Sequence, residues 1–526
     1  MTSSLADGDW HRLHPATPLL RGGIFAFAAL GFVIANLRER LIDIFFGVPM
    51  GSGDPLDEIY RRGAVGWALL VVAAILIAIV TGFYLSWRMH TFRVNDEIVE
   101  VRSGIVFRSN RKARLDRIQG VNIERALVPR LFGAARLEVS GAGQDANVQL
   151  AYLGSARADE LRRDILRLAS GARRAAEPEG EAAAEPEPER EPGPGIGERL
   201  AAEAGSSVGD FARGRVSEFL APELDPDAAP PESVVRIPPG RLLGSIVLNG
   251  FTVVLIIGGI ALVVSGAVSD RGWLPLAVLP GLLGAAGFYV SRLTRSLRFS
   301  IAGTPDGVRV GFGLLSTSNE TLPPGRIHAI GISQPLLWRP FGWWQVRINK
   351  AGRSSNQGAA GEASTTVLPV GTVTDVARVL ELVLPGYDAE EQRALIDRGM
   401  RSKGGDDGYV NAPRRAAWLR PFSWRRTGYT VSAGAAVLRR GIVSRELLLV
   451  PLARVQSVGI DQGPIQRRLR LASARLHTVA GPVTASLSVV DAAEAVRLFE
   501  SIAAGAVSHA ISDTSHRWNH TTGAPE

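Results

Sequence analysis

Long uncharged, apolar stretches dominate the hydrophobic pattern of the chain. Residues 63–87, 242–269 and 272–291 contain no charged side chain, and a helix needs roughly 20 apolar residues to cross the hydrocarbon core of a bilayer. A shorter stretch of 16 uncharged residues lies between Arg21 and Arg38. We expect it to form a first membrane helix, with a cleaved signal peptide or a half-inserted helix as the alternatives. The pattern predicts about four transmembrane helices, arranged as two hairpins.

Paired helices return the chain to its starting side, so the large polar regions are expected to share one compartment. Basic residues flank the outer ends of both pairs, and by the positive-inside rule these regions face the cytoplasm. The flanking residues include Arg12, Arg21, Arg88, Arg93, Arg236, Arg241, Arg292 and Arg295. Four arginines in the first connecting loop argue the other way. No ionisable group lies inside the spans, so we expect the helices to be anchors rather than a transport pathway.

An internal repeat begins at Gly104, Gly313 and Gly441. An arginine stands 13 residues after each glycine, and a second arginine stands 13 residues after the first. These arginines are Arg117, Arg130, Arg326, Arg339, Arg454 and Arg467. They either pair with a carboxylate inside their own unit or bind lipid phosphates or an acidic partner. We favour a structural role, because the first arginine of each unit adjoins an apolar strand pattern.

Each repeat unit has the pattern of a small sheet followed by a helix. Alternating segments before each glycine predict β-hairpins. Apolar residues after the first arginine are spaced by three and then two, which predicts β-bulges at Gln119-Gly120, Ala329 and Gln456-Ser457. A stretch with apolar residues three and four apart closes each unit. We therefore expect a short β-sheet or partial barrel with one C-terminal helix in each unit.

The repeat resembles the bacterial pleckstrin-homology-like (PH-like) domain of the YdbS/YdbT type. The residues that carry the resemblance are Ser103-Gly104-Ile105, Arg117 to Val121, Arg130 to Gly133, Ala142-Gly143 and the N-terminal Arg12-Leu13-His14-Pro15. The resemblance to YdbT-like proteins implies two membrane hairpins and three PH-like domains, over nearly the whole chain. The second copy departs from it at His328 and by an insertion at Gly352–Ser364, and the third copy lacks the Phe-Gly pair.

The fold class expected is therefore an α+β multidomain membrane protein. It would combine about four transmembrane helices with three PH-like β-sheet or partial-barrel domains, each with a C-terminal helix. The predicted segments are an N-terminal cytoplasmic tail at 1–18, transmembrane hairpin 1 at 19–88, PH-like domain 1 at 89–171, a disordered Ala/Glu/Pro linker at 172–232, transmembrane hairpin 2 at 233–293, PH-like domain 2 at 294–385, a linker at 386–413, PH-like domain 3 at 414–507 and a disordered tail at 508–526.

Composition narrows the chemistry further. The 526-residue chain has no cysteine, which excludes disulfides, Cys-ligated metal centres and Cys nucleophiles. No nucleotide-binding, hydrolase, kinase or paired-histidine metal motif is present. We expect no catalytic residue, no cofactor and no metal. The net charge of +8 fits the anionic inner face of a membrane better than nucleic acid, given the apolar spans.

The function expected from these features is a membrane-anchored, non-enzymatic scaffold. Its PH-like domains would bind protein partners or self-associate at the cytoplasmic face. The alternatives are a peripheral reader of anionic lipid and an accessory component of a transporter. The resemblance to YdbT-like proteins implies a multi-pass protein of the bacterial inner membrane, with a role in envelope stress or antimicrobial-peptide resistance.

Overall fold

The computed structural model describes most of the chain outside the first predicted hairpin and the Ala/Glu/Pro linker. The residues described are 5–14, 17, 70, 74, 81–82, 84–85, 87–104, 108–141, 147–169, 235–268, 278–304, 307–314, 316–323, 325–351, 365–384, 390–405, 407–432 and 434–513. The chain divides into two compact units, and each is described by itself. Unit 1 contains 1–117, 123–139 and 145–165, and unit 2 contains 118–122, 140–144 and 166–526.

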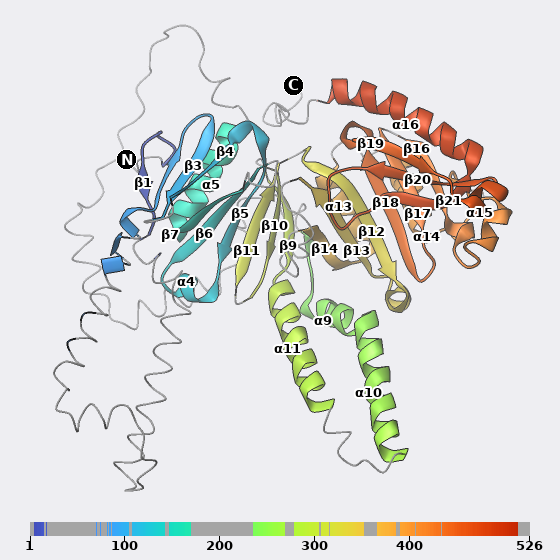
Figure 1. The fold of residues 1–526 in the computed structure, drawn as a ribbon, viewed down its shortest axis with the longest axis horizontal. Coiled ribbons are helices and arrows are strands. Elements are labelled where there is room, and N and C mark those ends of the chain that lie inside the picture. The colour runs from blue at the N-terminus through green and yellow to red at the C-terminus, as the bar shows by residue number, and fades with distance from the viewer. Residues whose placement is uncertain are drawn as a thin grey trace. The chain divides into compact units, whose positions relative to one another are not determined.

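The three repeats share one order of elements (Figure 1). A two-residue strand comes first, followed by four longer strands, a short helix, two further strands and an α-helix. Repeat 1 has β1 (His11–Arg12), β2 (Thr91–Val94), β3 (Ile98–Ser103), β4 (Ser109–Arg114), β5 (Ile118–Arg125), α4 (Leu127–Leu131), β6 (Ala134–Gly141), β7 (Val148–Gly154) and α5 (Ser155–Ala169).

Repeats 2 and 3 follow the same order. Repeat 2 has β8 (Val235–Arg236), β9 (Ser300–Thr304), β10 (Gly307–Phe312), β11 (Thr317–Leu322), β12 (Ile327–Pro335), η5 (Leu336–Phe341), β13 (Trp344–Lys350), β14 (Thr366–Gly371) and α13 (Val373–Val383). Repeat 3 has β15 (Val410–Asn411), β16 (Gly428–Ser432), β17 (Ala435–Arg440), β18 (Ser444–Pro451), β19 (Ser457–Asp461), α15 (Pro464–Arg468), β20 (Leu471–His477), β21 (Ser486–Asp491) and α16 (Ala492–Ser512).

The predicted hairpins before the repeat glycines are confirmed. Strands β2–β3, β9–β10 and β16–β17 pair antiparallel across short turns. Gly104, Gly313 and Gly441 all have positive φ, at 106°, 108° and 81°. A Cβ at Gly313 would lie 1.9 Å from the carbonyl oxygen of Ser316, and one at Gly441 would lie 2.0 Å from that of Ser444. The turn after each of these two glycines therefore excludes a side chain.

The predicted β-bulges are borne out where the pairing of the strand is defined. The register of β12 against β13 shifts between Ile327 and Ala329. In repeat 3, the Gln456 N–H donates to the His477 carbonyl at 2.9 Å, while Ser457 is the register partner of the same His477. Two residues opposite one is the arrangement of a β-bulge.

Unit 1 contains a four-stranded sheet with the order β1-β2-β3-β4, and β6 pairs with β7. The C-terminal helix of repeat 1 forms as predicted. Its Leu161 and Ile165 are fully buried, and Leu168 of the same expected face is half-buried. Burial of one apolar stripe is what holds a helix of this length against a sheet.

Unit 2 is built around one seven-stranded sheet that two repeats share. Its order is β14-β13-β12-β18-β17-β16-β15, so β12 of repeat 2 pairs with β18 of repeat 3. We call it the central sheet. Leu447 and Leu449 face the core that the central sheet forms with repeat 2, and Leu448 and Val450 face the core of repeat 3. A strand buried on both faces has no reason to alternate, which explains the continuous Leu-Leu-Leu-Val run.

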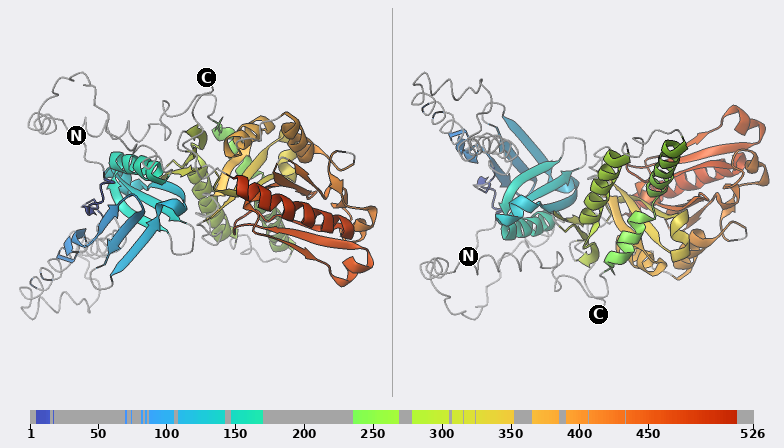
Figure 2. Two further views of the ribbon diagram at one scale, coloured as in Figure 1. Left: turned by 90° about the horizontal axis from the view of Figure 1, so that it is seen from above. Right: turned by 90° about the horizontal axis from the view of Figure 1, so that it is seen from below.

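Strands β8–β11 supply residues to the core on one face of the central sheet, and strands β19–β21 supply residues to the core on its other face. Strands β8 to β10 and helix α13 contribute to the core on the repeat 2 side. Strands β20 and β21 and helix α16 contribute to the core on the repeat 3 side. Helix α16 lies across the three strands β19, β20 and β21 (Figure 2).

Three helices follow β8: α9 (Pro239–Val247), α10 (Gly250–Val268) and α11 (Val278–Ser296). The apolar stretch 242–269 was expected to be one membrane helix, whereas the structure divides it into two helices, α9 and α10. The chain bends by 51° between α9 and α10, and among the described helices this bent pair alone has the length and composition to cross a bilayer, while no single helix has. The first predicted hairpin, apart from scattered residues, and the predicted turn at 269–271 lie outside the described residues.

Two segments expected to lie outside the domains are ordered parts of unit 2. The predicted linker 386–413 contains helix α14 (Glu390–Arg401), whose Leu395, Ile396 and Met400 are buried in the core with repeat 2. Helix α16 continues to Ser512, five residues into the tail predicted from 508. The predicted linker 172–232 lies outside the described residues.

Candidate functional site

The repeat arginines occupy different environments. Arg117 and Arg467 are exposed, Arg326 is half-buried and Arg130 is buried. Arg454 forms an ion pair with Asp513 at 2.6 Å.

Arg339 donates to the backbone carbonyls of Ile442 and Val443, just before β18 begins. Arg454, in contrast, follows the end of β18. Within unit 2, therefore, these two arginines lie at opposite ends of one strand and do not form a common site.

The short helix after the fifth strand ends alike in all three repeats. Gly133 and Gly342 follow α4 and η5 with φ of 65° and 64°. The third repeat lacks the Phe-Gly pair, and Arg470 takes the same left-handed conformation with φ of 52°. Repeat 3 thus keeps the fold without the Phe-Gly pair. The left-handed conformation costs Arg470 free energy that a glycine would not lose.

The Ala-Gly pair of repeat 3 has a packing role at the border with repeat 2. Asn349 in β13 donates to the Val483 carbonyl at 2.7 Å, and its side-chain oxygen accepts from the Val483 N–H at 2.9 Å. A Cβ at Gly481 would lie 2.2 Å from that oxygen. Only glycine therefore allows this loop to reach Asn349.

A small cavity adjoins this loop. Its volume is about 40 Å³, and its lining includes Arg347, Arg440, Glu446 and Thr484. Arg440 and Glu446 form an ion pair at 2.7 Å. A space of this size holds water molecules rather than an organic cofactor.

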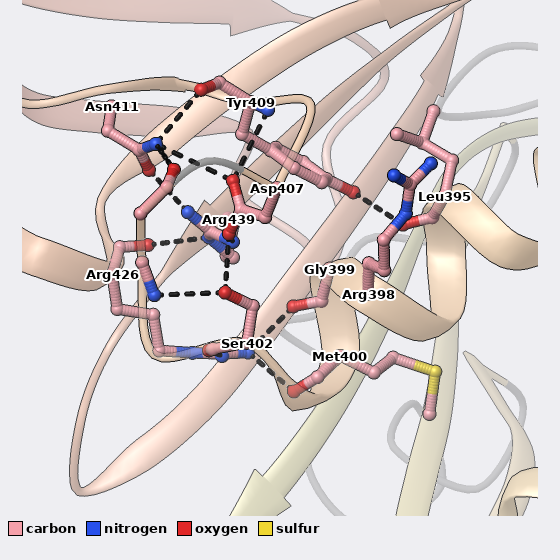
Figure 3. Close-up of polar contacts among 12 residues, drawn as sticks. Leu395, Arg398, Gly399, Met400, Ser402, Asp407, Tyr409, Asn411, Arg426 and Arg439 are labelled. Atoms are coloured by element: carbon pink, nitrogen blue, oxygen red, sulfur yellow. Dashed lines mark hydrogen bonds and ion pairs between the residues drawn. The ribbon is translucent and has the colours of Figure 1, made fainter.

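A buried arginine cluster joins α14 to the strands of repeat 3 (Figure 3). The guanidinium of Arg439 is fully buried, forms an ion pair with Asp407, donates to Asn411 and stacks 4.5 Å from the Tyr409 ring centroid. Burial raises the pKa of Asp407, but hydrogen bonds from Arg439 and Ser402 outweigh this effect and hold the pKa below its ordinary value.

Arg426 completes this cluster by capping a helix. It donates to the carbonyls of Gly399, Met400 and Ser402 at the C-terminal end of α14. Burial, and next the charge of Arg439, lower the pKa of Arg426 to about 9, so it stays protonated at neutral pH. A cation at the end of a helix satisfies its last carbonyls and its dipole. This cluster therefore has a structural role: it holds α14 against the strands of repeat 3.

Repeat 1 contains a related, more open arrangement. Arg102 stands two residues before Gly104, as Arg439 stands two before Gly441. The guanidinium of Arg102 lies 4.1 Å from the Trp10 ring centroid and forms an ion pair with Glu100 at 3.3 Å.

Sequence reasoning missed the strands that carry these aromatic partners. Trp10 immediately precedes β1, and Tyr409 immediately precedes β15. Both strands have only two residues, too few for an alternating pattern. The available signal was a proline shortly after each of these strands, three residues after β1 and two residues after β8 and β15.

The base of the helix pair α9–α10 is held by repeat 2. The indole N–H of Trp338 donates to the Leu248 carbonyl at 2.9 Å, at the bend between the two helices. Arg241 forms an ion pair with Asp375 at 2.8 Å. A Cβ at Gly244 would lie 2.7 Å from the Trp343 ring, so α9 packs directly on this indole. Trp344, next in the sequence, is buried in the core.

The recurring element order defines a class: small β-sheet modules, each closed by a C-terminal helix and repeated along one chain. Comparison with known proteins identifies the class. The sequence matches the family described as bacterial PH domain over residues 43–169, 244–385 and 409–506. The chain belongs to this family.

A relative extends the likeness over most of the chain. The chain is 23% identical over 406 residues to the UPF0699 transmembrane protein YdbT of Bacillus subtilis strain 168, covering 74% of this chain and 72% of the relative. No solved structure matches the chain.

Proposed function

We propose that the chain is a membrane-anchored, non-enzymatic scaffold. Its PH-like domains would bind protein partners or further copies of the chain at the cytoplasmic face. The transmembrane name of the relative supports the membrane placement, as do the apolar side chains that α10 and α11 expose. A role in envelope stress or antimicrobial-peptide resistance, implied by the resemblance to YdbT-like proteins, is part of this proposal.

The observation that carries the proposal is the pairing of repeat 2 with repeat 3 through sheet edges. Strand β12 of repeat 2 pairs with β18 along six residues, from Ile330 opposite Leu449 to Pro335 opposite Ser444. A PH-like domain of this chain therefore already binds another by adding a strand to its sheet. Strand addition is also a general mode of protein recognition.

The strand of repeat 3 that corresponds to β12 is open. Strand β19 lies at the edge of the sheet β19-β20-β21 and pairs with β20 alone in the described part of the chain. It contains no Lys or Arg, the residues that commonly protect an exposed edge from pairing. Its Ile460 is exposed to solvent. We propose β19 as the docking edge for an extended segment of a partner.

The direction of the hydrogen bonds in β19 suggests a sharp test. The Leu476 N–H donates toward β21, to Ala485. In antiparallel strands alternate residues face opposite neighbours, so His477 and Arg475 face β19. Their register partners Ser457 and Gly459 face β20. The N–H of Ile460 consequently points to the open side.

The variant Ile460→Pro removes that outward N–H and spares the bonds to β20, whereas Ile460→Thr keeps it and serves as the matched control. Full-length protein would be crosslinked in its native membranes, and the crosslinked partners identified and quantified. We expect Ile460→Pro to lose most of a partner's crosslinks and Ile460→Thr to retain them. A partner set unaffected by both substitutions would remove β19 as the docking edge. Absence of any specific partner of the unaltered chain would remove the scaffold role.

A further inference from the structure

The segment between β15 and β16 occupies the place that a membrane hairpin occupies in the other repeats. In repeat 2, helices α9 to α11 lie between β8 and β9. In repeat 1, the predicted first hairpin lies between β1 and β2. In repeat 3, residues 412–427 fill the same interval with two short 3₁₀ helices, η7 (Arg414–Trp418) and η8 (Trp424–Arg426). We call residues 412–427 the replacement loop.

The replacement loop exposes two large aromatic side chains. Trp418 is 84% exposed and Phe422 is 79% exposed. Five arginines accompany them: Arg414, Arg415, Arg420, Arg425 and Arg426. Arg415 pairs with Asp491, and Arg426 caps α14. Arg414, Arg420 and Arg425 are exposed, and no ion pair within the described ranges includes them.

Strand registers fix where the replacement loop leaves unit 2. Asn411 lies opposite Gly428, so the loop begins and ends at one end of the central sheet. Gly428 lies opposite Arg439, at the end of β17. The turn between β17 and β18 therefore leaves the sheet at that same end.

The same end of the central sheet carries the base of the apolar helices. Ser444, at the start of β18, lies opposite Pro335, which directly precedes η5. Trp338 of η5 bonds to the bend between α9 and α10. In Figure 1, α9, α10 and α11 leave unit 2 on this side. The replacement loop thus shares an end of unit 2 with the helices that are proposed to enter the bilayer.

Further apolar side chains are exposed at this end. Helix α9 buries Leu242 and Ile246 on one face yet exposes apolar residues on the other. The exposed apolar residues of α9, η5 and the turn before β18 are Leu243, Val247, Leu336, Phe341, Ile442 and Val443. A helix that is apolar on both faces is typical of contact with both a core and a lipid.

The Phe-Gly motif also exposes an apolar side chain in the repeats that have a hairpin. Phe132 and Phe341, which precede the left-handed glycines, are each 53% exposed. Both belong to repeats with an apolar hairpin between the first two strands. This hairpin is α9 to α11 in repeat 2 and the predicted first hairpin in repeat 1. Repeat 3 has neither, and it exposes Trp418 and Phe422 in the replacement loop.

We propose that the replacement loop is an interfacial membrane anchor for repeat 3. Trp418 and Phe422 insert at the boundary between headgroups and acyl chains, in the bilayer that α10 and α11 enter. Arg414, Arg420 and Arg425 contact the phosphates of anionic lipids. Aromatic side chains beside cations are favoured at this depth of a membrane. The inference rests on the membrane placement given under the proposed function.

A chain without cysteine allows a direct test by single-cysteine labelling. Full-length Trp418→Cys and Phe422→Cys variants would carry a polarity-sensitive nitrobenzoxadiazole fluorophore in phosphatidylethanolamine–phosphatidylglycerol liposomes. Quenching by spin-labelled lipid would be compared with quenching by aqueous iodide. Ile257→Cys in α10 tests the anchor itself. Ile511→Cys is the matched control, because this residue is 82% exposed and lies near the Arg454–Asp513 pair, at the opposite end of the central sheet.

We expect the labels at 418 and 422 to be quenched by spin-labelled lipid at least about two-fold more than the label at 511. Lipid quenching at 257 together with equal quenching at 418, 422 and 511 would overturn the inference and leave the anchor intact. Aqueous behaviour at 257 would overturn both.

The lipid-phosphate contacts are tested separately. In the Trp418→Cys background, the triple substitution of Arg414, Arg420 and Arg425 by Gln should weaken lipid quenching in liposomes containing phosphatidylglycerol. In pure phosphatidylcholine the same substitution should have little effect. An equal effect in the two lipid mixtures would overturn the phosphate contacts.

Discussion

The fourth strands of repeats 1 and 3, β4 and β18, occupy the same place in the repeat and have opposite surroundings. In β18 the run Leu447–Val450 is buried on both faces. In β4 the corresponding residues are Asn110, Arg111, Lys112 and Ala113, and all except Ala113 are exposed. Strand β18 pairs with β12 and lies between two cores, whereas β4 is the edge of the sheet β1-β2-β3-β4. The residues of a repeated strand report what lies on its two faces, not its place in the repeat.

The arginines two residues before Gly104 and Gly441 show the same difference. The side chain of Arg439 is fully buried with Asp407, whereas that of Arg102 is 55% exposed beside Glu100. One guanidinium must find all of its partners within the protein, while the other keeps contact with water. The two positions therefore differ in what they contribute to stability.

The largest expected effect comes from exchanging the strand residues. Leu449→Lys places at the centre of β18 the residue that β4 has at the same position. Replacing a buried leucine by alanine costs about 2–5 kcal/mol, and burying an unpaired charge costs more. We expect unit 2 to unfold in detergent, seen as lost hydrogen-exchange protection of β12 and β18. The reciprocal Lys112→Leu should change the free energy of unfolding by about 0.5 kcal/mol or less. Retained protection in Leu449→Lys would contradict the two-faced burial of β18.

The second expected effect compares the two arginines. Arg439→Met leaves Asp407 buried without its cation, which costs about 3–5 kcal/mol. Arg102→Met removes an exposed cation, and the buried Glu100 keeps Arg93 and Asn110 as partners, so we expect a cost of about 0–1 kcal/mol. Thermal unfolding of full-length protein in detergent measures both. Equal shifts in melting temperature would show that burial does not distinguish these positions.

The third effect concerns pH and the position where repeat 2 has His328 and repeat 1 has Gln119. Burial, and next the charges of Arg454 and Arg326, lower the pKa of His328 to about 4. The unfolded chain, with an ordinary pKa near 6.5, binds this proton more readily, so stability falls as pH decreases from about 6.5 to about 4. We expect about 2–3 kcal/mol to be lost over this range. His328→Gln should flatten the urea midpoint across these pH values, and an unchanged slope would exclude His328 as the cause.

The smallest effect comes from the left-handed residue after the short helices. Arg470→Gly should stabilise repeat 3 by about 0.5–1 kcal/mol, because glycine accepts positive φ without steric cost. Gly342→Ala should destabilise repeat 2 by about 1 kcal/mol, since open space surrounds that position and conformation alone matters. Paired urea titrations compare the two variants. The same sign of change in both would contradict the equivalence of these positions.

Local patterns accounted for much of the fold. Alternation before Gly104, Gly313 and Gly441 predicted the three hairpins, because a hairpin depends on neighbouring residues and on its turn. The bulge at Ala329 followed from one break in the alternation. Apolar spacing predicted the C-terminal helix of each repeat.

Elements that depend on distant partners were missed. Helix α14 has a mostly polar sequence and owes its place to Leu395, Ile396 and Met400, which contact a sheet formed elsewhere in the chain. The two-residue strands are too short for any period. The bend between α9 and α10 falls within an uncharged run, and Trp338, 90 residues away, bonds to it.

The amino-acid sequence by itself determined the threefold repeat, the turn glycines and the long apolar stretches, because side-chain direction within one strand or helix follows from spacing along the chain. Only the tertiary structure decided that repeats 2 and 3 share a sheet, that β19 stays an open edge and that the replacement loop lies at the end with α9. Those outcomes depend on which strand edges pair, and edge pairing joins residues more than a hundred positions apart, beyond the reach of any local pattern.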